Sequence, residues 1–220
     1  LARPVEADGV ASLIAVMQRE GIDLCVAGEE SYLVKDEGLA NACKAAGIPC
    51  WGPPKESAQL EASKQFAKEF MVRHGIPTGG YASVNTIDDA RSAIDGKYPT
   101  VLKFDGLAAG KGVAVCPDEA SAEEFLQEVL VERKFGAGRL LVEDFLEGPE
   151  ISIFVSVVDH DYQILAPARD YKRIYDGDEG PNTGGMDAVS SLEMLNPELR
   201  QVIEETMVRP TVEGLLKEGL

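Results

Sequence analysis

The segment that most restricts the fold is rich in glycine and lies between two short apolar runs. Residues 103–115 read KFDGLAAGKGVAV. A Walker loop requires Gly-x-x-x-x-Gly-Lys-Ser/Thr between a strand and a helix. Here Gly106 and Gly110 are one residue too close for that spacing, and Gly112 follows Lys111 where Ser or Thr would stand. Strand-forming residues on both sides instead predict the tip of a β-hairpin.

Two interpretations of this tip remain open from its residues alone. Glycines allow backbone N–H groups to approach an anion closely, so Lys111 and the amides of residues 106–112 can form a mobile lid over phosphate. Lys103, on the strand just before, would add a second positive charge. The alternative is an ordinary turn whose lysines are solvated.

The composition excludes several classes of protein. A chain of 220 residues corresponds to one or two domains. It has 21 Lys and Arg against 38 Asp and Glu, a net charge of −17, which argues against nucleic acid or an anionic membrane as a partner. No apolar run approaches the roughly 20 residues of a membrane span, and we find no signal peptide. These features favour a cytoplasmic enzyme with small-molecule substrates.

The cysteines give no sign of a metal or redox motif. No two of them form a Cys-x-x-Cys pair, so we expect neither metal binding nor redox chemistry from them, and a reducing compartment is the simpler setting. The four residues are Cys25, Cys43, Cys50 and Cys116.

The first part of the chain reads as a βαβ unit. Residues 22–28 and 48–52 have strand character, and residues 32–47 between them have helical character that ends at Gly47. Strand, helix and strand in this order predict a partial, doubly wound parallel α/β domain over residues 1–60. A linking helix and a domain boundary are expected within residues 61–80.

The second part of the chain is richer in strands, which predicts an antiparallel α+β domain. We divide it into a small subdomain, residues 81–150, and part of a larger one, residues 151–220. Ser121 and Glu124 have capping-box spacing at the start of a helix, and Pro210 is expected to kink a later helix. Strands are expected at 99–106, 113–116, 139–148 and 150–159, and a helix at 118–132.

A candidate site for a purine follows the third of these strands. In VEDFLEGPE, residues 142–150, Glu143 and Glu150 flank the apolar pair Phe145 and Leu146. Backbone groups at such a strand end can pair with the edge of the base, and the carboxylates can accept from its amine and from ribose hydroxyls. The alternative is that both glutamates are solvated strand ends.

Three segments in order carry a resemblance to a known family. They are QLEASKQFAKEFMVRHGIPT at 59–78, KFDGLAAGKGV at 103–113 and GDEGPNTGGM at 177–186. Together they resemble the phosphoribosylamine–glycine ligase (glycinamide ribonucleotide synthetase) family of the ATP-grasp superfamily. The likeness extends from VAGEE at 26–30 to RPTVEG at 209–214. It implies that an ATP-grasp domain follows the α/β domain.

The resemblance implies a role for each matching residue. Those expected to contact ATP are Lys64, Lys103, Gly110, Lys111, Gly112, Glu143, Phe145, Leu146 and Glu150. Those expected to support catalysis are Lys103, Lys111, Asp170, Lys172 and Arg173. Those expected to form a loop around the acceptor substrate are Asn182, Thr183, Gly184 and Gly185.

The reaction implied by the resemblance is ATP-dependent formation of an amide. Glycine would be activated as glycyl phosphate, and the amine of 5-phosphoribosylamine would displace the phosphate, with Mg²⁺ (or Mn²⁺) as the metal. The protein needs no covalent nucleophile for this reaction. The alternatives are another ATP-grasp carboxylate–amine ligase or carboxylase, or a nucleotide-binding fragment without catalytic activity.

Some positions depart from the family pattern. Tyr171 stands where the family usually has His, and Asp187 stands where it usually has Gly. The chain also begins with Leu1 rather than Met, which leads us to expect a fragment that lacks both ends. We name no metal ligand within the chain, because the family's metal ligands are expected beyond Leu220.

Overall fold

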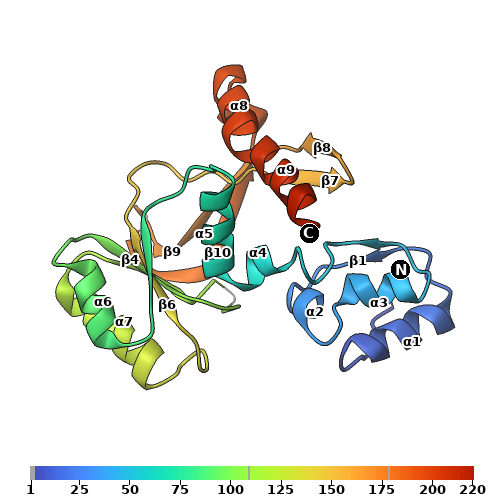
Figure 1. Ribbon diagram of the computed structural model, residues 1–220, viewed down its shortest axis with the longest axis horizontal. Coiled ribbons are helices and arrows are strands. Elements are labelled where there is room, and N and C mark those ends of the chain that lie inside the picture. The colour runs from blue at the N-terminus through green and yellow to red at the C-terminus, as the bar shows by residue number, and fades with distance from the viewer. Residues whose placement is uncertain (1–2, 109, 178) are drawn as a thin grey trace. The chain divides into compact units, whose positions relative to one another are not determined.

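The structure is a computed structural model that describes residues 3–108, 110–177 and 179–220, without the side chains of 179, 181 and 182. Its contacts divide the chain into two compact units (Figure 1). The first unit ends at Ala62, and the second extends from Ser63 to Gly219. We describe each unit separately.

The first unit contains the βαβ arrangement that the sequence predicts. Its two short strands are parallel, with Cys25 opposite Cys50 and Val26 opposite Trp51. Met17, Leu39 and other apolar side chains from the helices form its buried core. The elements are α1 Val10–Glu20, β1 Cys25–Val26, α2 Ser31–Val34, α3 Leu39–Ala45, β2 Cys50–Trp51 and α4 Gln59–Ala62.

The single helix predicted over residues 32–47 is instead two helices. The chain turns between α2 and α3, where Asp36 and Gly38 have positive φ angles of 52° and 85°. A Cβ atom at Gly38 would lie 2.7 Å from the carbonyl oxygen of Leu33, so a side chain does not fit there. The backbone turn therefore interrupts a segment whose composition favours helix.

The second unit is built around a four-stranded antiparallel sheet in the order β3-β6-β4-β5. The predicted hairpin is confirmed, because β4 and β5 pair from Thr100 opposite Cys116 to Lys103 opposite Val113. The strands are β3 Tyr81–Val84, β4 Thr100–Phe104, β5 Val113–Cys116 and β6 Leu140–Asp144. The helices of this region are α5 Lys64–Arg73, α6 Ile87–Ile94 and α7 Glu119–Leu126, which continues as the π-helix Gln127–Val131.

One face of this sheet is covered by α6 and α7 (Figure 1). Leu102 and Phe104 of β4 and Leu140 of β6 point into the core beneath these helices. Because side chains alternate along a strand, Lys103 and Glu143 project from the opposite face. The sequence thus places the charged pair on the face that the two helices leave uncovered.

The predicted capping box of α7 lies three residues earlier than expected. Asp118, rather than Ser121, is the N-cap: its carboxylate accepts a hydrogen bond from the backbone N–H of Ser121 at 2.9 Å. The Ser121 hydroxyl completes the box in place of a glutamate. Both residue types cap helices well, so spacing alone did not separate them.

The remainder of the second unit consists of two hairpins followed by helices. A small core forms around Ile164, Leu195 and Ile203. Pro210 lies at the start of α9, which follows α8 and the π-helix Glu204–Val208 without a break, so it stands within one continuous helical run, and the expected kink stays a prediction. The elements are β7 Val155–Val158, β8 Asp161–Ile164, β9 Ala168–Tyr175, β10 Glu179–Ser190, the 3-10 helix Leu192–Met194, α8 Pro197–Ile203, the π-helix Glu204–Val208 and α9 Arg209–Glu218.

Candidate active site

A buried cluster of charges lies on the face of the sheet opposite α6 and α7, where Lys68 of α5 meets Lys103 of β4 and Glu143 of β6. The same carboxylate oxygen of Glu143, Oε2, is 2.9 Å from Nζ of Lys68 and 2.9 Å from Nζ of Lys103. The side chains of Glu143 and Lys68 are 7% and 8% exposed, whereas that of Lys103 is 30% exposed. Lys103 is therefore the member of the cluster whose amine is accessible to a ligand.

Lys68 was not among the residues that the sequence analysis selected. Its amine also donates to Oγ1 of Thr78 at 2.8 Å and to the carbonyl oxygen of Gly79 at 3.1 Å, and it lies 5.6 Å from the ring centre of Tyr81. These contacts occupy Lys68 within the protein, so it positions Glu143. The sequence did offer a signal for Lys68, because it follows Lys64 by four residues and therefore lies on the same face of α5.

The start of α5 is tied to the base of the hairpin loop. Ser63, the N-cap of the helix, donates its hydroxyl to Asp105 at 3.1 Å, and the backbone N–H of Gln65 donates to the same carboxylate oxygen at 3.2 Å. The Lys64 amine donates to the carbonyl oxygen of Gly106 at 2.8 Å. Lys64, expected to contact ATP, thus contacts the loop backbone.

Two glycines of the loop lie where a side chain would not fit, one against the ring of Phe104 and the other against Ala108. A Cβ atom at Gly106 would lie 2.7 Å from Cε1 of that ring, and one at Gly112 would lie 2.7 Å from Cβ of Ala108. The backbone N–H of Phe104 donates to the carbonyl oxygen of Gly112 at 2.7 Å. Glycine at these two positions therefore has a packing role beyond any contact with phosphate.

The tip of the loop carries the second predicted phosphate lysine. Lys111 is exposed, and its backbone N–H donates to the carbonyl oxygen of Ala108 at 2.9 Å. Gly110 has a φ of 75°, a conformation that favours glycine. Residue 109, part of the predicted lid, lies outside the described residues.

The segment predicted to hold adenine directly follows β6. Phe145 and Leu146 are 42% and 70% exposed, which leaves both side chains available to a ligand. Together with Glu143 they line an open hollow of about 580 Å³. The lysines at 64, 103 and 111 do not line this hollow.

The strand β9 brings three predicted residues together. Nζ of Lys172 is 3.3 Å from a carboxylate oxygen of Glu150 and 3.3 Å from one of Asp170. Partial burial by itself lowers the pKa of Lys172, but the attraction of Glu150 and the contact with Asp170 outweigh it, so this pKa lies above its ordinary value. Lys172 is therefore a fixed positive charge.

The predicted acceptor loop is, in the structure, part of an irregular strand. Arg173 lies opposite Asn182 in the β9–β10 ladder, and the pairing register shifts on both sides of that position. The Thr183 hydroxyl donates to the carbonyl oxygen of Lys172 at 2.8 Å and accepts the backbone N–H of Gly185 at 3.0 Å. Composition suggested a loop, but pairing with β9 decided the conformation.

Strands β9 and β10 also carry Arg173 and the two positions that depart from the family pattern. Nη1 of Arg173 donates to the carbonyl oxygen of Gly180 at 3.0 Å. Tyr171 and Asp187, the departures from the family pattern, lie opposite each other. The side chain of Asn182 lies outside the described part of the structure.

Possible metal ligands are sparse across the part of the chain that the structure describes. There, the one group of three or more His, Cys, Asp or Glu side chains consists of three cysteines in the first unit. Mg²⁺ prefers oxygen ligands, so these cysteines do not fit that metal.

Among the described residues, no helix is both long and apolar enough to span a bilayer.

The second unit is an ATP-grasp domain, because residues 62–220 match a family model of that kind. Solved structures with related folds include the biotin carboxylase of Campylobacter jejuni in complex with a nucleotide, with a TM-score of 0.73 at 19% identity over 93% of this chain and 46% of that one. At such low identity the likeness establishes the fold alone.

Family models identify the chain more narrowly. Residues 62–220 match the ATP-grasp (A) domain of phosphoribosylglycinamide synthetase, and residues 2–61 match its N domain. The chain therefore belongs to the phosphoribosylglycinamide synthetase family.

Individual relatives agree with this assignment. The phosphoribosylamine–glycine ligase of Allochromatium vinosum is 44% identical over 98% of this chain and 51% of its own length. The crystal structure of the Thermotoga maritima phosphoribosylamine–glycine ligase has a TM-score of 0.76 at 34% identity, over 99% of this chain and 52% of that one. The chain thus spans about half the length of the curated relatives it matches.

Proposed function

We propose that this chain forms the ATP-binding part of a ligase that joins glycine to 5-phosphoribosylamine and yields glycinamide ribonucleotide, ADP and phosphate. Membership of the family and relatives named for this reaction support the proposal. The structural observation that carries it is the Lys68–Glu143–Lys103 cluster beside the glycine-rich hairpin. Such a site offers fixed positive charge and backbone amides for a polyphosphate.

Lys103 and Lys111 would supply positive charge to the phosphates of ATP. Glu143 holds the amine of Lys103 in place, and Lys68 limits the movement of Glu143 in turn. A preorganised cation stabilises negative charge on phosphate oxygens without further reorganisation. Lys111 would add a second charge as the loop closes, and Lys64 would support that loop through Gly106.

The remaining site residues would bind the nucleoside of ATP and the acceptor substrate. Phe145 and Leu146 would contact adenine, and Glu150 would accept from ribose hydroxyls. The acceptor side would involve the cluster around Lys172 on β9 and the bulged segment 182–185 of β10.

The chemistry proposed for this site is a sequence of two displacements. The carboxylate of glycine attacks the γ-phosphate of ATP, giving glycyl phosphate and ADP, and the amine of 5-phosphoribosylamine then displaces phosphate. Positioning and charge stabilisation are the protein's contributions to phosphoryl transfer of this kind. Mg²⁺ or Mn²⁺ bound to the phosphates would neutralise part of their charge.

Replacing Lys103 by alanine tests the nucleotide site. Loss of one charge-assisted hydrogen bond of about 1.5–3 kcal/mol should weaken ATP binding roughly ten- to two-hundred-fold. The variant should fold, because Glu143 keeps its contact with Lys68. Lys134→Ala is the matched control, since this half-exposed lysine pairs with Glu128 on the surface. Unchanged affinity in calorimetric titrations of Lys103→Ala would remove this residue from the site.

Substrate specificity needs a separate experiment on the complete protein in which these 220 residues occur. ADP release should require glycine and 5-phosphoribosylamine together. Release that depends on bicarbonate, or on another amino acid, would instead support a different ATP-grasp enzyme. ATP binding without ADP release under any of these conditions would support a nucleotide-binding protein without catalytic activity.

A further inference from the structure

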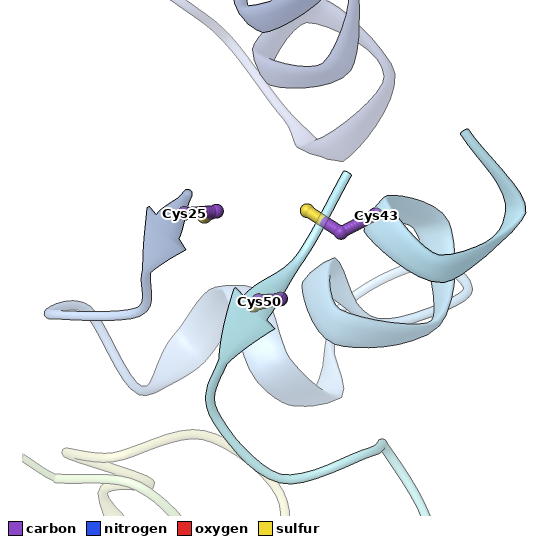
Figure 2. Close-up of side chains that lie close together, drawn as sticks. All are labelled: Cys25, Cys43 and Cys50. Carbon is purple, nitrogen blue, oxygen red and sulfur yellow. The ribbon is translucent and has the colours of Figure 1, made fainter. Parts of the chain in front are cut away.

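Three cysteines that are far apart in the sequence meet in the first unit. Cys25 lies on β1 and Cys50 directly opposite it on β2, and Cys43 lies on α3. Figure 2 shows Cys43 reaching from its helix toward the strand pair that carries the other two. All three are free thiols. The two that are closest in the sequence, Cys43 and Cys50, are seven positions apart, so the cluster forms no short sequence motif.

The spacing of the thiols is close to that of a metal–thiolate site. The three Sγ atoms all lie within 4.8 Å of one another. A metal ion bound at about 2.3 Å from each of three sulfurs in a plane separates them by about 4.0 Å. Shifts of less than about 1 Å, which side-chain rotation can supply, would therefore bring the sulfurs to bonding distance.

Burial and mutual proximity disfavour the thiolate form of Cys43 and Cys50. Cys43 is fully buried, while Cys25 and Cys50 are partly exposed and provide access. Burial and the neighbouring thiols raise the pKa of Cys43 to about 12, and burial together with Cys25 raises the pKa of Cys50. A bound cation reverses this effect, because it attracts the thiolates that otherwise repel one another.

We propose that the three thiols of Cys25, Cys43 and Cys50 form a binding site for one soft d¹⁰ metal ion, of the class of Zn²⁺, Cd²⁺ or Cu⁺. Sulfur ligands select soft cations over Mg²⁺ or Ca²⁺. Three S–H bonds break, three sulfur–metal bonds form, and three protons pass to solvent, with no change in oxidation state. Among the described residues no carboxylate or imidazole joins the group, so a fourth ligand would come from solvent.

Packing alone provides the competing explanation, since a buried cysteine behaves as a small apolar residue. Cys116 is the example within this chain: it is buried in the core of the second unit and belongs to no such group. Cys116 therefore serves as an internal control for the other three cysteines. If the cluster is a metal site, Cys25, Cys43 and Cys50 should respond to metal and Cys116 should not.

The test titrates the reduced, metal-free 220-residue chain with Cd²⁺ and follows the ultraviolet charge-transfer absorption of cadmium thiolates. We expect one ion per chain, with no response to Mg²⁺. Cys25→Ser and Cys50→Ser should each weaken binding by at least about 10–100-fold, the loss typical of an outer-shell change. Cys116→Ala should bind as the parent chain does.

Two measurements on the parent chain do not depend on the folding of any variant. Cd²⁺ binding in weak buffer should release about three protons, because metal binding displaces them from thiols. Alkylation followed by mass spectrometry should show Cys25, Cys43 and Cys50 protected by Cd²⁺. Absence of binding, protection of fewer than three of these residues, or full affinity in Cys25→Ser or Cys50→Ser would overturn the proposal. ATP affinity is measured separately, so its outcome does not decide this question.

Discussion

Glu143 links the stability of the second unit to its charged site, and its replacement by alanine should be costly. The carboxylate and Lys68 are both nearly inaccessible to solvent and lie 2.9 Å apart. Breaking a buried pair by removing one partner typically costs about 3–5 kcal/mol, because the other charge stays buried and uncompensated. Lys103 can turn toward solvent, since its side chain is 30% exposed, so most of the loss comes from Lys68.

Replacing Lys68 by methionine should cost less than replacing Glu143. In that variant Glu143 keeps its ion pair with Lys103 at 2.9 Å. The acceptors left behind are the hydroxyl of Thr78 and the carbonyl oxygen of Gly79. Thr78 is exposed, so water can replace the lost partner of its hydroxyl, and leaving the half-buried carbonyl oxygen of Gly79 unsatisfied costs about 1–3 kcal/mol. The structure thus predicts an order for the two variants as well as their magnitudes.

Urea unfolding followed by circular dichroism measures both losses. Trp51, the chain's one tryptophan, lies in the first unit, so its fluorescence helps to assign the transition that shifts. Glu123→Ala is the control, because Glu123 pairs with Arg91 at the surface. An exposed pair is worth about 0–1 kcal/mol. If Glu143→Ala costs no more than Glu123→Ala, the cluster is not the buried network described above.

Three further predictions concern the loop and the C-terminal helix of the second unit. Amide hydrogen exchange at residues 106–108 and 110–112 should slow when ATP is added, and unchanged exchange would argue against a closing lid. Gly214→Ala should destabilise the unit by about 1–3 kcal/mol in urea unfolding, because the new Cβ would lie 2.7 Å from the His74 ring; an equally stable variant would show that α9 can move away. Hydrogen bonds from Arg73 and then His74 lower the pKa of Glu218 to about 2, so its contribution to stability is present above about pH 4.3 and is lost as the pH falls toward 2. Glu218→Gln should weaken that acid dependence, and an unchanged profile of stability against pH would contradict the assignment.

Features that depend on neighbouring residues could be predicted from the sequence. The glycine-rich segment predicted a hairpin, and β4 pairs with β5 on either side of it. Gly47 was expected to end a helix, and it follows Ala46, the C-cap of α3, with a φ of 72°. Turn residues act through the φ angles they permit, and hydrophobic periods act over a few positions, so both can be read locally.

Local patterns failed where two explanations fit the same residues. Asp118 and Ser121 are both good caps, and hydrogen-bond geometry selected Asp118. The segment 182–185 has the composition of a loop, but the facing strand β9 supplies partners that hold it in a bulged ladder. Tertiary pairing overrides composition at such positions because it satisfies backbone groups that a loop would leave to water.

The charge cluster and the thiol cluster depended entirely on the tertiary structure. Lys68 and Glu143 are 75 positions apart, yet α5 and β6 bring their side chains to 2.9 Å. Cys25 and Cys50 had been set aside for lack of a motif, and the pairing of two parallel strands places them side by side. Sequence spacing reports which side chains share a helix or strand face. Which faces meet is decided by the packing of whole elements, and that information lies in no single segment of the chain.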